Sequence, residues 1–157
     1  MAKPKRWEPF MRKYAKDTKF VGAEIGVLRG NFSVSMLDYF PNLTLYLVDN
    51  WSEYPETEVI ARERLKVFGD RARIIKGDSI EVASQVPNNL DFVFIDADHS
   101  YEACLKDLQV YSKKVRSGGW ITGHDYPNKP GVKQAVEEFF PKGFKRDVDY
   151  TFMVTKK

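Results

Sequence analysis

Cysteine and histidine are both scarce in this sequence, since Cys104 is the only cysteine and His99 and His124 are the only histidines among its 157 residues. A lone cysteine cannot form a disulfide within the chain, so the disulfide-rich class of small secreted proteins is excluded. Imidazole chemistry, if the protein uses any, must depend on His99 or His124. A reducing compartment suits such a chain, and we expect the protein to be cytoplasmic.

Long apolar runs are also missing, because none approaches the roughly 20 residues that cross a bilayer. The N-terminal stretch MAKPKRWEPFMRKYAKD lacks the apolar centre of a secretory signal. We therefore expect no membrane as a partner. The contents of 43% hydrophobic and 30% charged residues are those of an ordinary globular protein. The length predicts one domain, residues 1–157, in which residues 1–17 form a basic helix or arm.

The net charge is only +3, and the positive surplus gathers near the start of the chain, in Lys3, Lys5, Arg6, Arg12, Lys13, Lys16 and Lys19. One interpretation is a solvated, partly frayed first helix. The other is a clamp for nucleic acid. We favour the first interpretation, because phosphate-binding surfaces usually spread over a fold.

Short β-rich runs alternate with stretches of helical periodicity along most of the chain. The strands are nearly all apolar, which predicts a parallel sheet covered by helices on both faces. The fold class is therefore a doubly wound, Rossmann-like three-layer α/β sandwich. The stretch 144–154, FKRDVDYTFMV, predicts a closing antiparallel hairpin. The expected strands are 20–27, 43–49, 72–78, 90–96 and 118–125, and the expected helices are 32–40, 58–68, 79–86, 101–115 and 131–140.

Polar residues recur where each expected strand ends. In a sheet of this kind, ligands bind outside the carboxyl ends of the strands. Isolated Asp or Ser residues at such places are common helix caps, but the same chemistry at five successive strand ends indicates a binding crevice. The residues concerned are Glu24, Gly26, Asp49, Asp78, Asp96, His124 and Asp125.

The first loop, AEIGVLRGNFS, has a Glu-x-Gly-x-x-x-Gly pattern in place of the Gly-x-Gly-x-x-Gly of dinucleotide binders. Glu24 would repel a pyrophosphate, but it suits a cofactor that carries an ammonium and a sulfonium. S-adenosylmethionine has both groups. Its carboxylate can use the backbone N–H groups from Gly30 to Ser33, and its ribose hydroxyls suit Asp49.

The chain resembles the class I S-adenosylmethionine-dependent methyltransferases, in particular a small subgroup similar to macrocin-type O-methyltransferases and cephalosporin hydroxylase-like proteins. The matching stretches run in family order from about Val21 to the C-terminal end: EIGVLRGNFS, LVDNW, GDS, LDFVFIDADHSYE, DLQVYSKKVRSGGWITGHDY and GVKQAVEEFF. The resemblance implies that Glu24 and Gly26 border the methionine moiety, that Asp49 with Asn50 holds the ribose, and that Asp78 with Ser79 contacts the adenine. Trp51 either flanks the adenine ring or is a local core residue.

The resemblance also assigns chemistry to Asp96 and His99. In related metal-dependent O-methyltransferases the matching Asp binds a divalent cation and the matching His is the general base. A hydroxyl is a poor nucleophile at neutral pH, and a base or a cation can assist its deprotonation. A cation at Asp96, His124 and Asp125 is one hypothesis. The alternative is that His124 and Asp125 bond to each other and hold the loop before Pro127.

Two further motifs are absent, and their absence bears on the acceptor. No Asn/Asp-Pro-Pro-Tyr/Phe stretch follows the fourth strand, and no Pro-Cys pair is found there, which disfavours methylation of DNA bases. We therefore expect O-methylation of a hydroxyl on a small molecule or saccharide. Two alternatives stay open: an RNA or cap methyltransferase, and a catalytically silent protein with the same fold. We also expect a homodimer walled by surface aromatic residues, with Trp7, Phe10 and Tyr14 as candidates.

Overall fold

A computed structural model describes residues 5–157 of the chain, so that Lys3 and the rest of residues 1–4 lie outside the described part. The strands are β1 (Phe20–Ile25), β2 (Leu43–Asp49), β3 (Ala72–Lys76), β4 (Leu90–Ile95), β5 (Val115–Gly123), β6 (Lys145–Asp147) and β7 (Thr151–Thr155). The helices are α1 (Glu8–Lys13), α2 (Asn31–Tyr39), α3 (Glu56–Leu65), α4 (Tyr101–Lys114) and α5 (Pro130–Phe139), with short 3-10 turns η1 (Lys66–Arg71) and η2 (Ala83–Gln85).

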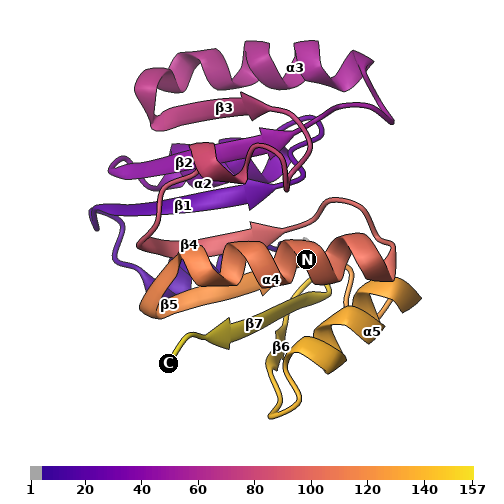
Figure 1. Cartoon of the computed structure of the whole chain (residues 1–157). Helices are drawn as coiled ribbons and strands as arrows, with labels where there is room; N and C mark the ends of the chain where they lie inside the picture. Colours follow the sequence, from indigo (N-terminus) through magenta and orange to yellow (C-terminus); the bar gives the residue numbers. More distant parts are fainter. Residues whose placement is uncertain (1–4) are drawn as a thin grey trace.

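The strands form one seven-stranded sheet in the order β3-β2-β1-β4-β5-β7-β6 (Figure 1). The first five strands pair in parallel, whereas β7 lies antiparallel between β5 and β6. The predictions of a doubly wound α/β sandwich and of a C-terminal antiparallel hairpin are confirmed. The strand order reverses between β1 and β4, and this is the point at which such sheets bind their ligands.

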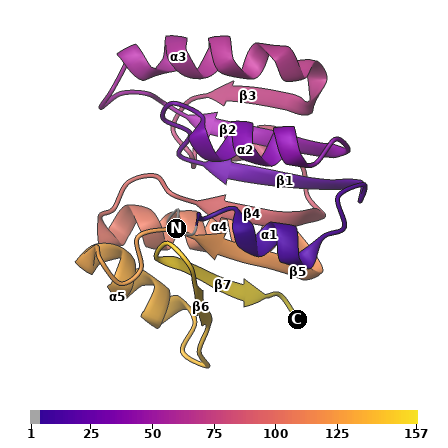
Figure 2. The same ribbon diagram turned by 180° about the vertical axis from the view of Figure 1, so that it is seen from behind.

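Two hydrophobic clusters cover the two faces of the sheet. Helices α4 and α5 lie in front of the sheet in Figure 1, whereas α1 and α2 lie in front of it in the reverse view of Figure 2. Leu108 of α4 and Val136 of α5 pack on the first face, and Phe32 of α2 and Leu65 of α3 pack on the second. The helices therefore fix the strand ends from both sides.

The helix expected at 79–86 is not present, and only the short turn η2 forms there. The Oδ1 atom of Asp78 accepts hydrogen bonds from the backbone N–H groups of Ile80 and Glu81, at 2.9 and 3.3 Å, which fixes a turn after β3. Pro87 disfavours helical geometry at the residue before it. Local hydrogen bonding and proline thus outweigh the apolar periodicity on which the prediction depended.

The first helix is anchored in the core, so the expectation of a frayed, solvated helix is wrong. Phe10 is fully buried and its ring centroid lies 4.7 Å from that of Phe92 and 5.6 Å from that of Trp120. Trp7 and Tyr14 pack against the same cluster. These aromatic residues do not form the expected surface wall, and the homodimer stays a prediction. Between residues 5 and 157, no helix combines the length and apolar character that a membrane span requires.

Candidate active site

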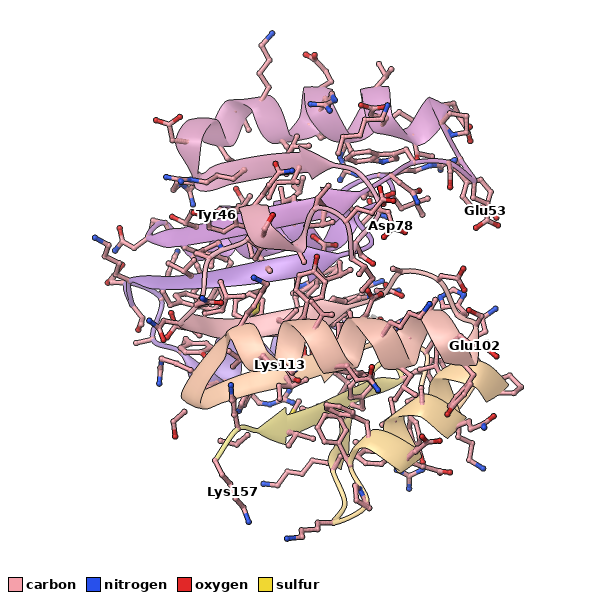
Figure 3. All side chains as sticks on the ribbon, in the orientation of Figure 1. Tyr46, Glu53, Asp78, Glu102, Lys113 and Lys157 are labelled. Atoms are coloured by element: carbon pink, nitrogen blue, oxygen red, sulfur yellow. The ribbon has the colours of Figure 1, made fainter. Side chains whose placement is uncertain are left out.

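A cleft of about 960 Å³ opens at the carboxyl ends of the parallel strands. Figure 3 shows Asp78 and Glu53, which both line the cleft, at the side of the molecule toward which the parallel strands point. The structure brings nearly all the sequence-predicted site residues together here: Glu24, Gly26, Asp49, Asn50, Trp51, Asp78, Ser79, Asp96, His99, His124 and Asp125 line the cleft. Gly30 and Ser33 are not part of the described lining.

Two glycines give the first loop its shape. Gly26 has a φ of +91°, and a Cβ atom there would lie 2.1 Å from the carbonyl oxygen of Asp96, so no other residue fits. Gly30 has a left-handed φ of +74° at the N-cap position of α2. Gly26 therefore allows the chain after β1 to approach the backbone of Asp96 closely. Gly30 lies outside the cleft lining and allows the turn that leads into α2.

Glu24 is buried, with 2% of its surface exposed, and it accepts a hydrogen bond from the hydroxyl of the fully buried Ser33. Burial raises the pKa of the Glu24 carboxyl well above its usual value, despite the opposing effect of the Ser33 hydrogen bond. In the protein alone, burial therefore favours the neutral carboxyl over the negative charge that was expected at Glu24. The carboxyl is a buried part of the cleft wall, and the Ser33 hydroxyl, on α2, donates a hydrogen bond to it.

Asp49 ties three backbone N–H groups to the end of β2. Its Oδ2 atom accepts hydrogen bonds from Val27 and Leu28, at 2.7 and 2.8 Å, and its Oδ1 atom accepts one from Trp51, at 2.7 Å. A carboxylate oxygen can accept two hydrogen bonds, so Oδ1 keeps acceptor capacity toward the cleft. Asp49 thus fixes two loops and still offers a ligand-binding atom.

The two residues after Asp49 belong to the same turn. The Oδ1 atom of Asn50 accepts a hydrogen bond from the Ser52 backbone at 2.9 Å. Trp51 is 4% exposed, belongs to the core cluster, and donates its indole N–H to the Leu28 carbonyl oxygen at 2.8 Å. Trp51 therefore supports the first loop as a core residue and also lines the cleft.

Two residues of α4 form hydrogen bonds with Ser79 and thereby fix the loop after β3. The Ser79 hydroxyl donates to Asp107 at 2.5 Å, and the Tyr111 hydroxyl donates to the Ser79 carbonyl oxygen at 2.5 Å. Burial raises the pKa of Asp107 to about 6, because the charged carboxylate is disfavoured away from water. Asp107 could not be recognised from the sequence, since a carboxylate inside a helix carries no local signal of burial.

Asp96, His99 and Asp125 meet at the other end of the cleft. The Nε2 atom of His99 lies 2.8 Å from Oδ2 of Asp125 and 3.9 Å from Oδ1 of Asp96. The Asp125 hydrogen bond, supported by Asp96, raises the pKa of His99 to about 9, whereas partial burial opposes the rise. The imidazoles of His124 and His99 hold the pKa of the Asp125 carboxyl far below its usual value. Asp125 thus pairs with His99. The alternative of a His124–Asp125 hydrogen bond is not supported, because neither ring nitrogen of His124 has a hydrogen-bond partner among the described residues.

His124 is 8% exposed, and neither ring nitrogen has a hydrogen-bond partner among the described residues. Its Nδ1 atom lies 3.3 Å from Oδ1 of Asp125 and 3.6 Å from Oδ1 of Asp96. A buried imidazole without partners is costly, and it indicates that a ligand belongs there. One ligand atom from each of Asp96, His124 and Asp125 falls within 4.8 Å of the others, as a metal site requires.

Arg6 and Asp149 complete this end of the cleft, and neither was expected there from the sequence. The Nη1 atom of Arg6 forms an ion pair with Oδ2 of Asp96, and its Nε atom lies 3.5 Å from Oδ2 of Asp149. Arg12 pairs with Asp147 at 2.5 Å. Two of the basic N-terminal side chains, those of Arg6 and Arg12, therefore form ion pairs within the molecule. This weakens the interpretation of the segment as a clamp for nucleic acid.

A cleft at the reversal point of a parallel sheet is the place at which doubly wound α/β proteins bind their ligands, and the fold and the cleft place this chain in that class. Residues 23–126 match the family described as a methyltransferase domain. The chain belongs to this family, within the class I S-adenosylmethionine-dependent methyltransferases.

Individual relatives agree with this assignment. A curated, uncharacterized protein of Acanthamoeba polyphaga mimivirus is 29% identical over 125 residues, which are 73% of this chain and 57% of that protein. The chain thus spans little more than half the length of this relative. An O-methyltransferase from Bacillus cereus, solved in complex with SAH, has 20% identity and a TM-score of 0.67, and the match covers 87% of this chain and 74% of that chain. Precorrin-6y C5,15-methyltransferase from Geobacter metallireducens has 19% identity and a TM-score of 0.67, with coverages of 82% and 65%. At these identities the two solved structures support the fold.

Proposed function

We propose that this protein transfers the methyl group of S-adenosylmethionine to a hydroxyl oxygen of a small molecule or saccharide. The observation that carries the proposal is the cluster of His99, Asp96 and Asp125 in the same cleft as Asp49 and Asp78. Binding groups for an adenosyl cofactor and a group that can take a proton thus share one cavity. The O-methyltransferase among the similar structures supports the same choice.

The half of the cleft that contains Asp49 and Asp78, called the cofactor half below, would hold the cofactor. The free acceptor capacity of Asp49 Oδ1 suits the ribose hydroxyls, and the turn fixed by Asp78 suits the adenine. Glu24, a buried residue of the cleft wall, would receive the methionine ammonium, whose positive charge favours the ionised carboxylate. When bound, S-adenosylmethionine supplies an electrophilic methyl group.

His99, in its neutral form, receives the acceptor hydroxyl proton. Because the pKa of His99 is raised to about 9, we expect turnover to rise with pH up to about pH 9. The Nε2 atom of His99 is oriented by Asp125, and its side chain is 42% exposed, so an acceptor can reach it. Asp125 and Asp96 together favour the imidazolium that proton transfer produces, in the manner of a base oriented by a carboxylate. Positioning of the hydroxyl against the methyl group supplies further acceleration.

A divalent cation fits beside these groups, and Asp96, His124 and Asp125 would hold it. The mixed set of carboxylates and an imidazole suits a transition metal or zinc better than magnesium, which prefers oxygen ligands. Such a cation would lower the cost of forming the negative charge on the acceptor oxygen. The partnerless ring nitrogens of His124 support this part of the proposal.

The test is methyl transfer to a panel of hydroxylated acceptors, measured by mass spectrometry, with and without divalent cations. We expect His99→Ala to lower turnover by about 10²- to 10⁴-fold, as loss of a general base does, with the affinity for S-adenosylmethionine unchanged. Glu102→Gln is the control, because Glu102 is exposed at the start of α4 and outside this cleft (Figure 3). Turnover by His99→Ala at the wild-type rate would contradict the assignment.

A further inference from the structure

The candidate cation site already contains a positive side chain, that of Arg6. We propose that Arg6 limits the affinity of this site for divalent cations, because its guanidinium holds Asp96 and competes with a divalent cation for that carboxylate. The inference rests on the cation site of the proposed function, but it does not depend on methyl transfer.

Arg6 reaches the cleft from a fixed position. It lies four residues before Phe10, which is fully buried against Phe92 and Trp120. The Nζ atom of Lys13 lies 4.0 Å from the Trp120 ring centroid, at the other end of α1. The Arg6 side chain itself is 30% exposed. The structure therefore presents the guanidinium to the cleft as part of its wall.

The two oxygens of Asp96 face different partners. Oδ2 pairs with Arg6, whereas Oδ1 faces Nδ1 of His124 at 3.6 Å and Nε2 of His99 at 3.9 Å. A divalent cation that is bound by Asp96 and His124 would thus lie within a few ångströms of the guanidinium. Two positive centres at that separation repel each other strongly in a partly buried site.

The local charge balance shows what Arg6 does when no metal is bound. Asp96 and Asp149 both contact its guanidinium, and their side chains are 18% and 29% exposed. Without Arg6, these partly buried carboxylates would lack their fixed counter-charge, and a metal ion would be the natural replacement. Arg6 therefore lets the site stay folded without a metal, at the expense of metal affinity.

The experiment measures Mn²⁺ binding to the full chain by electron paramagnetic resonance of the free ion, without S-adenosylmethionine or acceptor. We expect Arg6→Gln to bind Mn²⁺ about tenfold or more tightly than the wild type, because one repelling charge is removed. Arg12→Gln is the matched control, since Arg12 belongs to the same basic segment but pairs with Asp147. It should leave the Mn²⁺ affinity unchanged.

A second variant tests whether the gain in Mn²⁺ affinity depends on Asp96. We expect the double variant Arg6→Gln, Asp96→Asn to lose the added Mn²⁺ affinity, with folding of each variant followed by circular dichroism. Equal Mn²⁺ affinity in Arg6→Gln and the wild type, or no binding in either, would overturn the proposal. An equal gain in Arg12→Gln would also overturn it, since displacement of α1 would then explain the effect. Because no methyl transfer is measured, failure of the proposed activity leaves these outcomes unaffected.

Discussion

The two halves of the cleft hold their carboxylates in different ways. In the cofactor half, Asp49 and Asp78 accept hydrogen bonds from backbone N–H groups. In the other half, which we call the acceptor half, Asp96 and Asp125 face the side chains of Arg6 and His99. Backbone donors are fixed by the fold itself, whereas side-chain partners can move or be replaced. The comparison indicates that the carboxylates of the cofactor half are held more rigidly than those of the acceptor half.

The largest expected effect concerns the anchor of the acceptor half. Phe10→Ala removes a fully buried ring from a packed aromatic cluster, and we expect it to lower the free energy of unfolding by about 3–5 kcal/mol. Chemical denaturation measures this change. Val67→Ala is the control, since Val67 is 80% exposed and its truncation should cost less than about 0.5 kcal/mol. Similar stabilities of the Phe10 and Val67 variants would show that α1 does not depend on Phe10.

A smaller effect is expected in the cofactor half. Asp49→Asn places an amide group among three backbone N–H donors, so one carboxylate oxygen is lost as an acceptor. Hydrogen bonds to a charged group contribute about 1.5–3 kcal/mol, which predicts about 10- to 100-fold weaker S-adenosylmethionine binding by calorimetry. Asp38→Asn, an exposed substitution on α2, is the control. Unchanged affinity in Asp49→Asn would remove Asp49 from the cofactor site.

The smallest effect concerns Asp107, whose carboxyl is 2% exposed and accepts a hydrogen bond from the Ser79 hydroxyl. Burial raises its pKa from 3.8 to about 6, so its favourable contribution is fully present below pH 3.8 and is lost as the pH rises through about 6. Asp107→Asn stays neutral at every pH. Relative to the wild type, this variant should gain on the order of 2 kcal/mol of stability between pH 4 and pH 7. A stability difference that does not vary with pH would contradict the raised pKa.

The cofactor half could be predicted well from the sequence because its parts are local. Asp49 and Asp78 follow apolar strands, and the topology of a parallel sheet brings strand ends to one edge. The sequence could not show that Ser33 lies behind Glu24, since α2 periodicity does not say which polar residue faces the sheet. Nor could it show the burial that suppresses the charge of Glu24.

The acceptor half could be predicted only in part. His124 and Asp125 directly follow a strand and His99 lies in the loop after β4, so all three were recognisable. Their pairing was not, because it depends on side-chain geometry across two loops. Arg6 is separated from Asp96 by 90 residues, and within a cluster of basic residues nothing distinguishes it. The first helix was misjudged for the same reason, since the burial of Phe10 arises from contacts distant in sequence.

The most direct measurement is a calorimetric titration of the protein with S-adenosylmethionine and, separately, with NAD. The account predicts binding of S-adenosylmethionine with an affinity in the micromolar range, about the usual range for such sites, and no binding of NAD. The first loop has a Glu-x-Gly-x-x-x-Gly pattern in place of the Gly-x-Gly-x-x-Gly of dinucleotide binders. Binding of NAD with no response to S-adenosylmethionine would contradict the account.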